Sequence, residues 1–415
     1  MLLVALNLAG SLLILAWLYR RGRARNVLFS VAAVFVFFAF GPLVNLLLDQ
    51  PVYFGIVTGT VSQASTGFLL ALVGLLAADL IKPQRSSFDV ERLVPVRTYD
   101  LLPLVLMCLA SYAAYVLATG GPEMIGADKL ARIELAGQWH YPYLLLETFA
   151  LALYVIARRT RFTRNLYWVN AAFYLVYCLV TTERDFIFVG FALLIQRQLF
   201  SRGVRSGRLI LFGTAGVVLA SGLATVRENL EFGVAQTLNQ GPVLFVDSFV
   251  MNAVPESYPY RLGQTYLDAA TSVLQVSWSD RPPLDEWLVS LYAPGWIGGY
   301  GFSLTAEAYL NFGMLGIPVV FALIGLGVRS LVNRCDQSDL AAYLTVLAIA
   351  GLLNALRGDS AQLLKIVVYG MVFFAVLHIV SSATDSHQLR RAAGQGDGQG
   401  RGGAVAGRPR RPGPG

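Results

Sequence analysis

The sequence predicts an all-α fold: a polytopic transmembrane helical bundle with one large external loop at residues 227–302. The composition is 56% apolar and 14% charged, and the mean hydropathy is +0.58, which is unlike a soluble domain of average composition. Apolar runs of about 17–25 residues recur along the chain, and this length crosses a hydrocarbon core ~30 Å thick. The runs do not alternate in polarity as the strands of a membrane β-barrel would. We therefore expect the chain to cross the membrane as helices.

Each long apolar run is expected to form one span, which makes about eleven. The spans are Leu2–Tyr19, Val27–Leu48, Ile56–Ile81, Leu101–Thr119, Tyr141–Ala157, Leu166–Val180, Asp185–Phe200, Leu209–Val226, Ser303–Val328, Leu340–Leu356 and Leu363–Ser381. The sixth and seventh runs are short. A single hairpin that only partly enters the bilayer is the alternative for these two.

The basic residues predict which way the bundle is oriented. They gather in alternate loops, at residues 20–25, 82–97, 158–164, 202–208 and 329–334, and in the C-terminal tail. Because positively charged loops stay in the cytoplasm, the N-terminus is expected outside and the C-terminus inside. The first apolar run has no basic region before it, so we expect a retained helix and not a cleaved signal peptide.

The domain organisation follows from the same pattern. Residues 1–381 form the membrane domain, and residues 227–302 are its large external loop. Residues 382–415 are rich in Gly, Arg and Pro, so they are expected to form a disordered basic cytoplasmic tail. Its arginines are expected to be solvated, and contact with anionic lipids is the alternative.

Several function classes have no signature in this sequence. The three cysteines (Cys108, Cys178 and Cys335) fall in predicted spans or on the cytoplasmic side, so no external disulfide is expected. The histidines are scattered, no Asp-x-Asp pair is present, and no phosphate-binding P-loop appears. We therefore expect no metal, no cofactor, no direct use of ATP and no nucleic acid partner.

Three arginines lie on the side that is otherwise poor in basic residues. Arg184 falls in the hairpin between two short spans, Arg227 follows the eighth span and Arg357 follows the tenth. A planar guanidinium can bind a phosphate with two hydrogen bonds. The three arginines are therefore candidates to hold a lipid diphosphate at headgroup depth. The alternative is that each one only anchors a helix end at the lipid headgroups.

Two carboxylates fall within predicted spans, where an ionisable group is costly and is a functional candidate. Glu307 lies one turn into the ninth span, and Glu147 lies roughly 9 Å into the fifth. Glu307 is the first choice for a catalytic base, and His140 is a weaker one. For Glu147 a structural ion pair with Lys365 is the alternative.

The external loop also supplies candidate substrate-binding residues. It is rich in Tyr and Trp, whose flat rings stack on sugars but also occur at membrane interfaces. Its Pro and Gly pairs predict turns that fold the loop back over the bundle. The candidates for substrate binding are Arg261, Arg281, Tyr300, Tyr309, Asn311 and His140.

Four segments of the sequence carry a family resemblance. They are Thr182–Asp185, Arg227 at the start of the loop, the Gly-Gly-Tyr-Gly-Phe-Ser-Leu-Thr-Ala-Glu-Ala-Tyr-Leu-Asn-Phe-Gly stretch within Gly298–Gly316, and Leu356–Gly358. Together they resemble the O-antigen polymerase family, the Wzy-type oligosaccharide repeat-unit polymerases. The resemblance covers roughly residues 166–380, and the Gly298–Gly316 stretch is its most specific part.

The resemblance implies a metal-independent glycosyltransferase with a GT-C-like fold in a bacterial inner membrane. Such an enzyme joins undecaprenyl-diphosphate-linked oligosaccharides at the periplasmic face into O-antigen, capsule or exopolysaccharide. It contacts membrane lipids, and a chain-length-determinant protein and a flippase are its expected partners. The catalytic set expected from the residues is Glu307, Arg184, Arg227 and Arg357, since departing diphosphate charge can be stabilised by arginines.

Two other functions fit the same features. An O-antigen ligase shares the architecture, the external arginines and the donor, but transfers the glycan to lipid A–core. A transporter of lipid-linked sugars is the non-enzymatic alternative. A transporter is expected to show related halves and charges at the middle of the membrane, and neither is visible in the sequence.

Overall fold

The regular structure of the described residues is entirely helical. The computed structural model describes residues 1–181 with gaps at 23–24, 51, 53–55, 86–100, 125–128 and 157–159, and residues 242–396 with gaps at 275, 277–280 and 293–300, together with isolated residues between 199 and 238. The helices are α1 (Leu2–Gly22), α2 (Val27–Leu47), the 3-10 turn η2 (Thr58–Thr60), α3 (Val61–Ile81), α4 (Leu102–Met124), α5 (Lys129–Ala136), α6 (His140–Ile156), α7 (Arg161–Thr181), α11 (Val243–Ala253), α12 (Gln264–Val273), α13 (Leu284–Tyr292), α14 (Leu304–Val332), α15 (Asp339–Ala355) and α16 (Ser360–Gly396).

Six stretches of helix in the described part are long and apolar enough to cross a membrane: α1, α2, Thr58–Ile81, α4, α14 and Ser360–Ala383. The helices α6 and α15 are apolar but shorter, at 17 residues each. The predicted seventh and eighth spans fall outside the described residues. The prediction of a multi-pass helical membrane protein is therefore confirmed, whereas the number eleven and the GT-C-like arrangement stay predictions.

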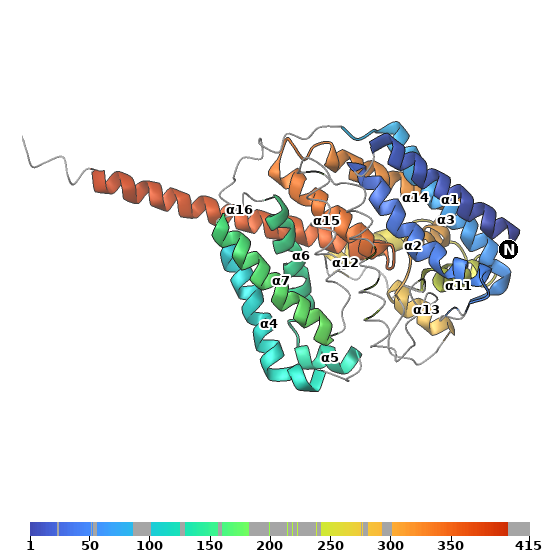
Figure 1. The fold of residues 1–415 in the computed structure, drawn as a ribbon, viewed down its shortest axis with the longest axis horizontal. Helices are drawn as coiled ribbons and strands as arrows, with labels where there is room; N and C mark the ends of the chain where they lie inside the picture. Colours follow the sequence, from blue (N-terminus) through green and yellow to red (C-terminus); the bar gives the residue numbers. More distant parts are fainter. Residues whose placement is uncertain are drawn as a thin grey trace, which may run out of the picture.

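The helices form two groups joined by α15 and α16 (Figure 1). The first group contains α1, α2, α3 and α14, and the second contains α4, α5, α6 and α7. The helix α15 contacts α2 and α14 on one side and α6 on the other, and α16 packs along α15. Beyond the bundle α16 continues to Gly396, past the point where the tail was predicted to begin (Figure 1).

Small residues bring α3 and α14 together. A Cβ atom at Gly74 would lie 2.4 Å from the carbonyl oxygen of Pro318, and one at Gly325 would lie 2.6 Å from the Cβ of Ala78. Side chains that small let two helix backbones approach closely, which is how helices associate in a membrane without a hydrophobic driving force. The Lys82 ammonium donates to the Ser330 hydroxyl at 2.8 Å near the end of the pair. The contact therefore runs along most of both helices.

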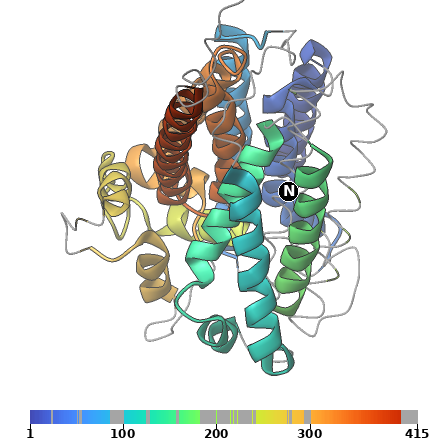
Figure 2. The same cartoon turned by 90° about the vertical axis from the view of Figure 1, so that its left-hand side faces the viewer.

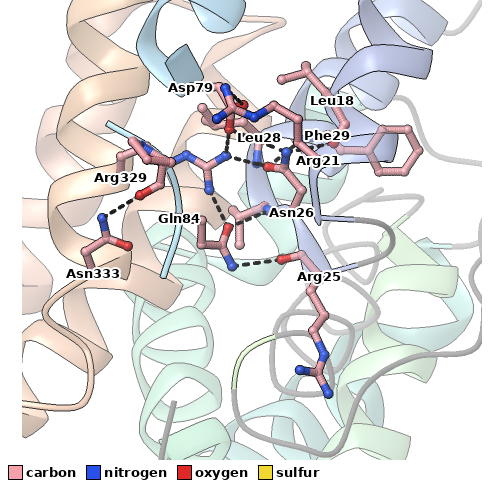
Figure 3. Close-up of polar contacts among 12 residues, drawn as sticks. Leu18, Arg21, Arg25, Asn26, Leu28, Phe29, Asp79, Gln84, Arg329 and Asn333 are labelled. Atoms are coloured by element: carbon pink, nitrogen blue, oxygen red, sulfur yellow. Dashed lines mark hydrogen bonds and ion pairs between the residues drawn. The ribbon is translucent and has the colours of Figure 1, made fainter. Parts of the chain in front are cut away.

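A buried charged cluster ties this group together at the end that is predicted to be cytoplasmic (Figure 3). Arg329 of α14 is 0% exposed. Its guanidinium donates to the carboxylate of Asp79 on α3, to the side-chain oxygen of Gln84, and to that of Asn26 at 2.6 Å. Arg21 of α1 lies 3.4 Å from the other carboxylate oxygen of Asp79. The sequence places Arg329 among the basic residues of a predicted cytoplasmic loop, whereas its side chain is buried and links three elements.

Asn26 has a second role in the same cluster. Its side-chain oxygen accepts from the amides of Leu28 and Phe29, and so caps the start of α2. Its side-chain nitrogen donates to the carbonyl of Leu18 at 2.8 Å, which fixes the end of α1 against the start of α2. The short α1–α2 connection is therefore held by one side chain.

Tyrosine rings and one side-chain amide stabilise the packing of α6 against α7 in the second group. Tyr143, Tyr174 and Tyr177 form edge-to-face pairs between α6 and α7. Asn170 of α7 donates to the carboxylate of Glu147 on α6 at 2.5 Å. The ion pair of Glu147 with Lys365 that the sequence offered as an alternative is therefore replaced by a hydrogen bond to an amide.

Candidate functional site

The helix α14 is broken at Gly313, and the break fixes the segment that carries Arg261. Gly313 has φ 67° and ψ −161°, which are not helical values. The backbone amides of Arg261 and Leu262 donate to the carbonyls of Leu310 and Asn311 at 2.9 and 3.1 Å. A Cβ at Gly313 would lie 3.2 Å from the hydroxyl of Tyr260, and its φ lies in the left-handed region that favours glycine. The loop is therefore pinned to the last carbonyls before the break.

The side chain of Asn311 adds hydrogen bonds to this contact between the loop and α14, which we call the junction. Its carbonyl oxygen accepts from the amide of Gly263 at 2.8 Å, where α12 begins. Its NH₂ group donates to the hydroxyl of Thr265 at 2.6 Å and to the carbonyl of Glu307 at 2.8 Å. Asn311 thus sets where the first turn of α12 lies against α14.

Glu307 lies in the first turn of α14 and is 0% exposed. One carboxylate oxygen accepts from the hydroxyls of Thr265 and Ser360 at 2.8 and 2.7 Å, and the other accepts from the amide of Ser360 at 2.7 Å. Ser360 is the first residue of α16, where unpaired amides and the helix dipole favour a negative charge. The Glu307 carboxylate therefore joins α12, α14 and α16 at one point.

The end of the glycine-rich turn packs against Arg357. A Cβ at Gly301 would lie 2.9 Å from the Arg357 carbonyl oxygen, and its φ of +82° is again in the left-handed region. The guanidinium of Arg357 lies over the ring of Phe38 on α2, 5.1 Å from its centre. Ser303, which follows the turn, caps α14 by accepting from the amide of Ala306 at 3.0 Å. The structure therefore brings Gly301, Arg357 and the start of α14 together, a contact that the sequence did not predict.

Asp247 is a buried carboxylate at this junction that the sequence did not single out. It lies on α11, is fully buried, and accepts from the Ser303 hydroxyl at 2.5 Å. Burial raises its pKa to about 7, against the lowering effect of hydrogen bonds from Ser303 and Thr305. The signal that could have found it is weak, since one Asp in an apolar stretch of a long loop resembles many others.

A pocket of about 530 Å³ opens beside this junction. It is lined by Tyr258, Pro259, Tyr260, Arg261, Leu262, Gln264, Leu267, Arg281 and Trp287. The guanidinium of Arg261 lies over the ring of Trp287, 4.8 Å from its centre, and the ring of Tyr258 meets Trp287 edge-on at 5.7 Å. Figure 2 shows α12 and α13, which border the pocket, at the margin of the helical bundle. Cationic and aromatic side chains therefore share one cavity.

The two arginines of the pocket influence each other. Burial lowers the pKa of Arg261, and the positive charge of Arg281 lowers it further, while Asp268 acts in the opposite direction. Arg281 is exposed. Two of the predicted substrate-binding residues are thus placed together, although twenty residues of sequence separate them.

Of the other predicted site residues, the structure describes Tyr309 and His140. Tyr309 accepts from the amide of Gln63 at 3.1 Å and donates to the carbonyl of Val254 at 3.1 Å, so it ties α14 to α3 and to the loop. His140 lies in the second group, with its ring nitrogen 2.6 Å from the Tyr177 hydroxyl. Arg184, Arg227 and Tyr300 lie outside the described residues. The structure brings Glu307, Asn311 and Arg261 together, and it places His140 among tyrosines of α6 and α7.

In the described part of the chain, no three His, Cys, Asp or Glu side chains gather as a metal site.

Two helices within residues 227–302 pack on the bundle, as the turn residues predicted for this loop. The helix α11 packs against α2, α3 and α14, and α12 packs against α14 and α16.

The comparison with protein families gives one match. Residues 285–384 match the family model described as O-antigen polysaccharide polymerase Wzy. The match spans nearly all of α13, all of α14 and α15, and the first part of α16, and it includes Glu307, Asn311 and Arg357. No curated protein and no solved structure matches the chain.

Proposed function

Because residues 285–384 carry the domain of the Wzy family of O-antigen polysaccharide polymerases, we propose that this membrane protein joins oligosaccharide repeat units carried on undecaprenyl diphosphate. The reaction takes place at the periplasmic face of a bacterial inner membrane, where nucleotide sugars are absent and a lipid-linked donor is needed. The product is an O-antigen, a capsule or an exopolysaccharide. A chain-length-determinant protein and a flippase are the expected partners.

The chemistry is a glycosyl transfer with a diphosphate leaving group. A hydroxyl oxygen of the acceptor sugar forms a bond with the anomeric carbon of the donor unit, while the bond from that carbon to the phosphate oxygen breaks. Undecaprenyl diphosphate departs with the electron pair of that bond, and the hydroxyl proton passes to a base or to water. Stabilising the negative charge on the leaving diphosphate is the main demand, and arginines meet it through paired hydrogen bonds.

The observation that carries this proposal is the junction at the start of α14. Within the family-matched region, Glu307 and Asn311 hold the first turn of α12 and the start of α16, while Arg357 lies against the glycine-rich turn. The same junction borders a pocket with two arginines and three aromatic rings. A glycosyl transfer needs anion-binding and sugar-stacking groups in one place.

We assign the residues of this site separate roles. Arg184, Arg227 and Arg357 bind the diphosphates, and Glu307 or a group that it positions receives the hydroxyl proton. Both oxygens of Glu307 are occupied by hydrogen bonds from Thr265 and Ser360. Three of the roughly four acceptor positions of this carboxylate are therefore used, and the one that remains for an acceptor hydroxyl is on the oxygen that accepts from the Ser360 amide.

The orientation used here places the N-terminus in the periplasm and the C-terminus in the cytoplasm. It follows from the positively charged loops. Under this orientation the Leu304 end of α14, the loop helices and Arg357 all lie at the periplasmic side, and the Arg329 cluster lies at the cytoplasmic side. A transferase with a lipid-linked donor needs its site at the outer membrane boundary, which is where this assignment puts it.

The direct test uses purified protein in lipid nanodiscs with lipid-linked repeat units and no nucleotide. We expect a ladder of lipid-linked products that differ by whole units. Transfer of single units to added lipid A–core without a ladder would instead identify a ligase. Passage of intact units across vesicle membranes with no new glycosidic bond would identify a transporter.

A further inference from the structure

The pocket beside α12 has two positively charged side chains, Arg261 and Arg281, and no Asp or Glu among the residues that line it. Arg261 is half-buried and Arg281 is exposed, and both line the cavity. Within the described residues, no carboxylate lies within ion-pair distance of either guanidinium; the ion pairs found there are those of Asp79 with Arg21 and Arg329. Placing like charges together is unfavourable, and an anion bound between them would relieve that repulsion.

The position of Arg261 is fixed before any ligand arrives. Its backbone amide is bonded to the Leu310 carbonyl at the break in α14, and its guanidinium carbon lies 4.8 Å from the centre of the Trp287 ring. The N–H groups at the edge of a guanidinium point along its plane, so packing on a ring leaves them able to meet a carboxylate with two hydrogen bonds. Because both the backbone and the side chain are held, little conformational entropy is lost when an anion binds.

The rest of the lining matches a sugar ring better than an isolated anion. Tyr258 and Tyr260 are partly exposed at the cavity, and Gln264 adds an amide that can both donate and accept. Flat phenol rings cover the apolar face of a sugar while their hydroxyls remain hydrogen-bonded. A volume of about 530 Å³ lies within the range of small-molecule sites, roughly 300–1,000 Å³. That is more room than one phosphate group needs.

We propose that this pocket binds a negatively charged sugar of the repeat unit, with its carboxylate held between Arg261 and Arg281. The inference rests on the proposed function, because it names the class of glycan that the polymerase takes: an acidic one, such as a unit that contains a uronic acid. The pocket then selects the unit by charge and positions it beside the Glu307 junction.

A binding experiment tests this without relying on polymerisation. Full-length protein in nanodiscs is titrated by calorimetry with tri-galacturonate and with its methyl ester, which has the same rings and no charge. We expect the acid to bind at least tenfold more tightly than the ester. We also expect Arg261→Gln and Arg281→Gln each to weaken binding of the acid about tenfold or more, since each removes one charge-assisted hydrogen-bonding group.

The control is Arg164→Gln, which removes an exposed arginine at the start of α7 and should leave binding unchanged. Arg281 is exposed, so its variant should fold even if the Arg261 variant does not. Equal binding of the acid and the ester, or unchanged binding in Arg281→Gln, would overturn the inference. So would inorganic pyrophosphate that displaces the acid and binds more tightly, because the pocket would then be a diphosphate site.

The ladder assay separates this inference from the function on which it rests. A ladder from a neutral lipid-linked unit that Arg281→Gln does not affect would overturn the acidic-sugar site and leave the polymerase standing. If no lipid-linked unit, neutral or acidic, gives a ladder, the proposed polymerase function is wrong, whatever the affinity for tri-galacturonate.

Discussion

Substitutions of Glu307 distinguish a role as catalytic base from a role in holding α12, α14 and α16 together. In the alanine variant, the hydroxyls of Thr265 and Ser360 and the amide of Ser360 lose their common acceptor in a fully buried place. A buried donor left unpaired costs about 1–3 kcal/mol. Three donors, two of which can rotate towards other acceptors, predict that Glu307→Ala lowers the free energy of unfolding by roughly 3–5 kcal/mol.

The glutamine variant should behave differently. Its NH₂ group can donate to the two hydroxyls, which accept as readily as they donate, while its oxygen still accepts from the Ser360 amide. We therefore expect Glu307→Gln to lower stability by only about 1–2 kcal/mol, because the three bonds are kept and lose only their charge assistance. If Glu307 takes the acceptor proton, the same variant should slow chain growth about 10²–10⁴-fold.

The assay for Glu307 pairs thermal unfolding in nanodiscs with the ladder assay. Glu147→Gln is a matched control, since Glu147 is also a buried span carboxylate held by an amide, Asn170. If Glu307→Ala is as stable as the wild type, the hydrogen bonds of Glu307 do not hold α12 and α16 in place. Wild-type chain growth in Glu307→Gln would show that the base lies elsewhere and that Glu307 only positions α12 and α16.

Three further predictions concern the bundle and the arginines. Arg329→Met removes the buried partner of Asp79 and leaves only the partly exposed Arg21 beside it, so it should destabilise the fold by up to about 3–5 kcal/mol, and Asp79→Asn in the same chain should recover part of this loss in unfolding measurements. A cysteine introduced near Gly263 should react with an impermeant thiol reagent in intact cells, and one near Arg161 only after permeabilisation; labelling near Gly263 only after permeabilisation would reverse the orientation. Arg→Lys at residues 184, 227 and 357 should abolish chain growth with little change in protein abundance, because Lys keeps the charge but cannot form the paired hydrogen bonds; active Lys variants at all three would mean that these arginines anchor helix ends.

The sequence predicted what depends on local pattern. Apolar runs predicted the long helices to within about five residues at each end, because burial in lipid requires an uninterrupted apolar stretch. The exception is the C-terminal end of α16, which was predicted at Ser381 and lies at Gly396. Glu307 and Asn311 are four residues apart, which places them on one face of a helix, and they do share the junction.

The rest depends on tertiary contacts that no local pattern encodes. Gly313 reads as one more glycine in an apolar helix, and only the amides of Arg261 and Leu262, some fifty residues earlier, reveal the break. The hydrogen-bond partners of Glu307 come from α12 and from the start of α16, so they are invisible in the sequence. Arg329 was counted among the basic residues of a predicted cytoplasmic loop, whereas its side chain is buried against Asp79.

In the proposed reaction, lipid-linked units are joined to one another with undecaprenyl diphosphate as the leaving group. The most direct measurement counts the undecaprenyl diphosphate released by the purified protein, in the presence of EDTA and without nucleotide, against the glycosidic bonds formed in the lipid-linked products. We expect one molecule to be released for each bond, with the growing chain still attached to lipid. Bonds that form only after Mg²⁺ or Mn²⁺ is restored, or lipid-linked units that remain single while no undecaprenyl diphosphate appears, would contradict it.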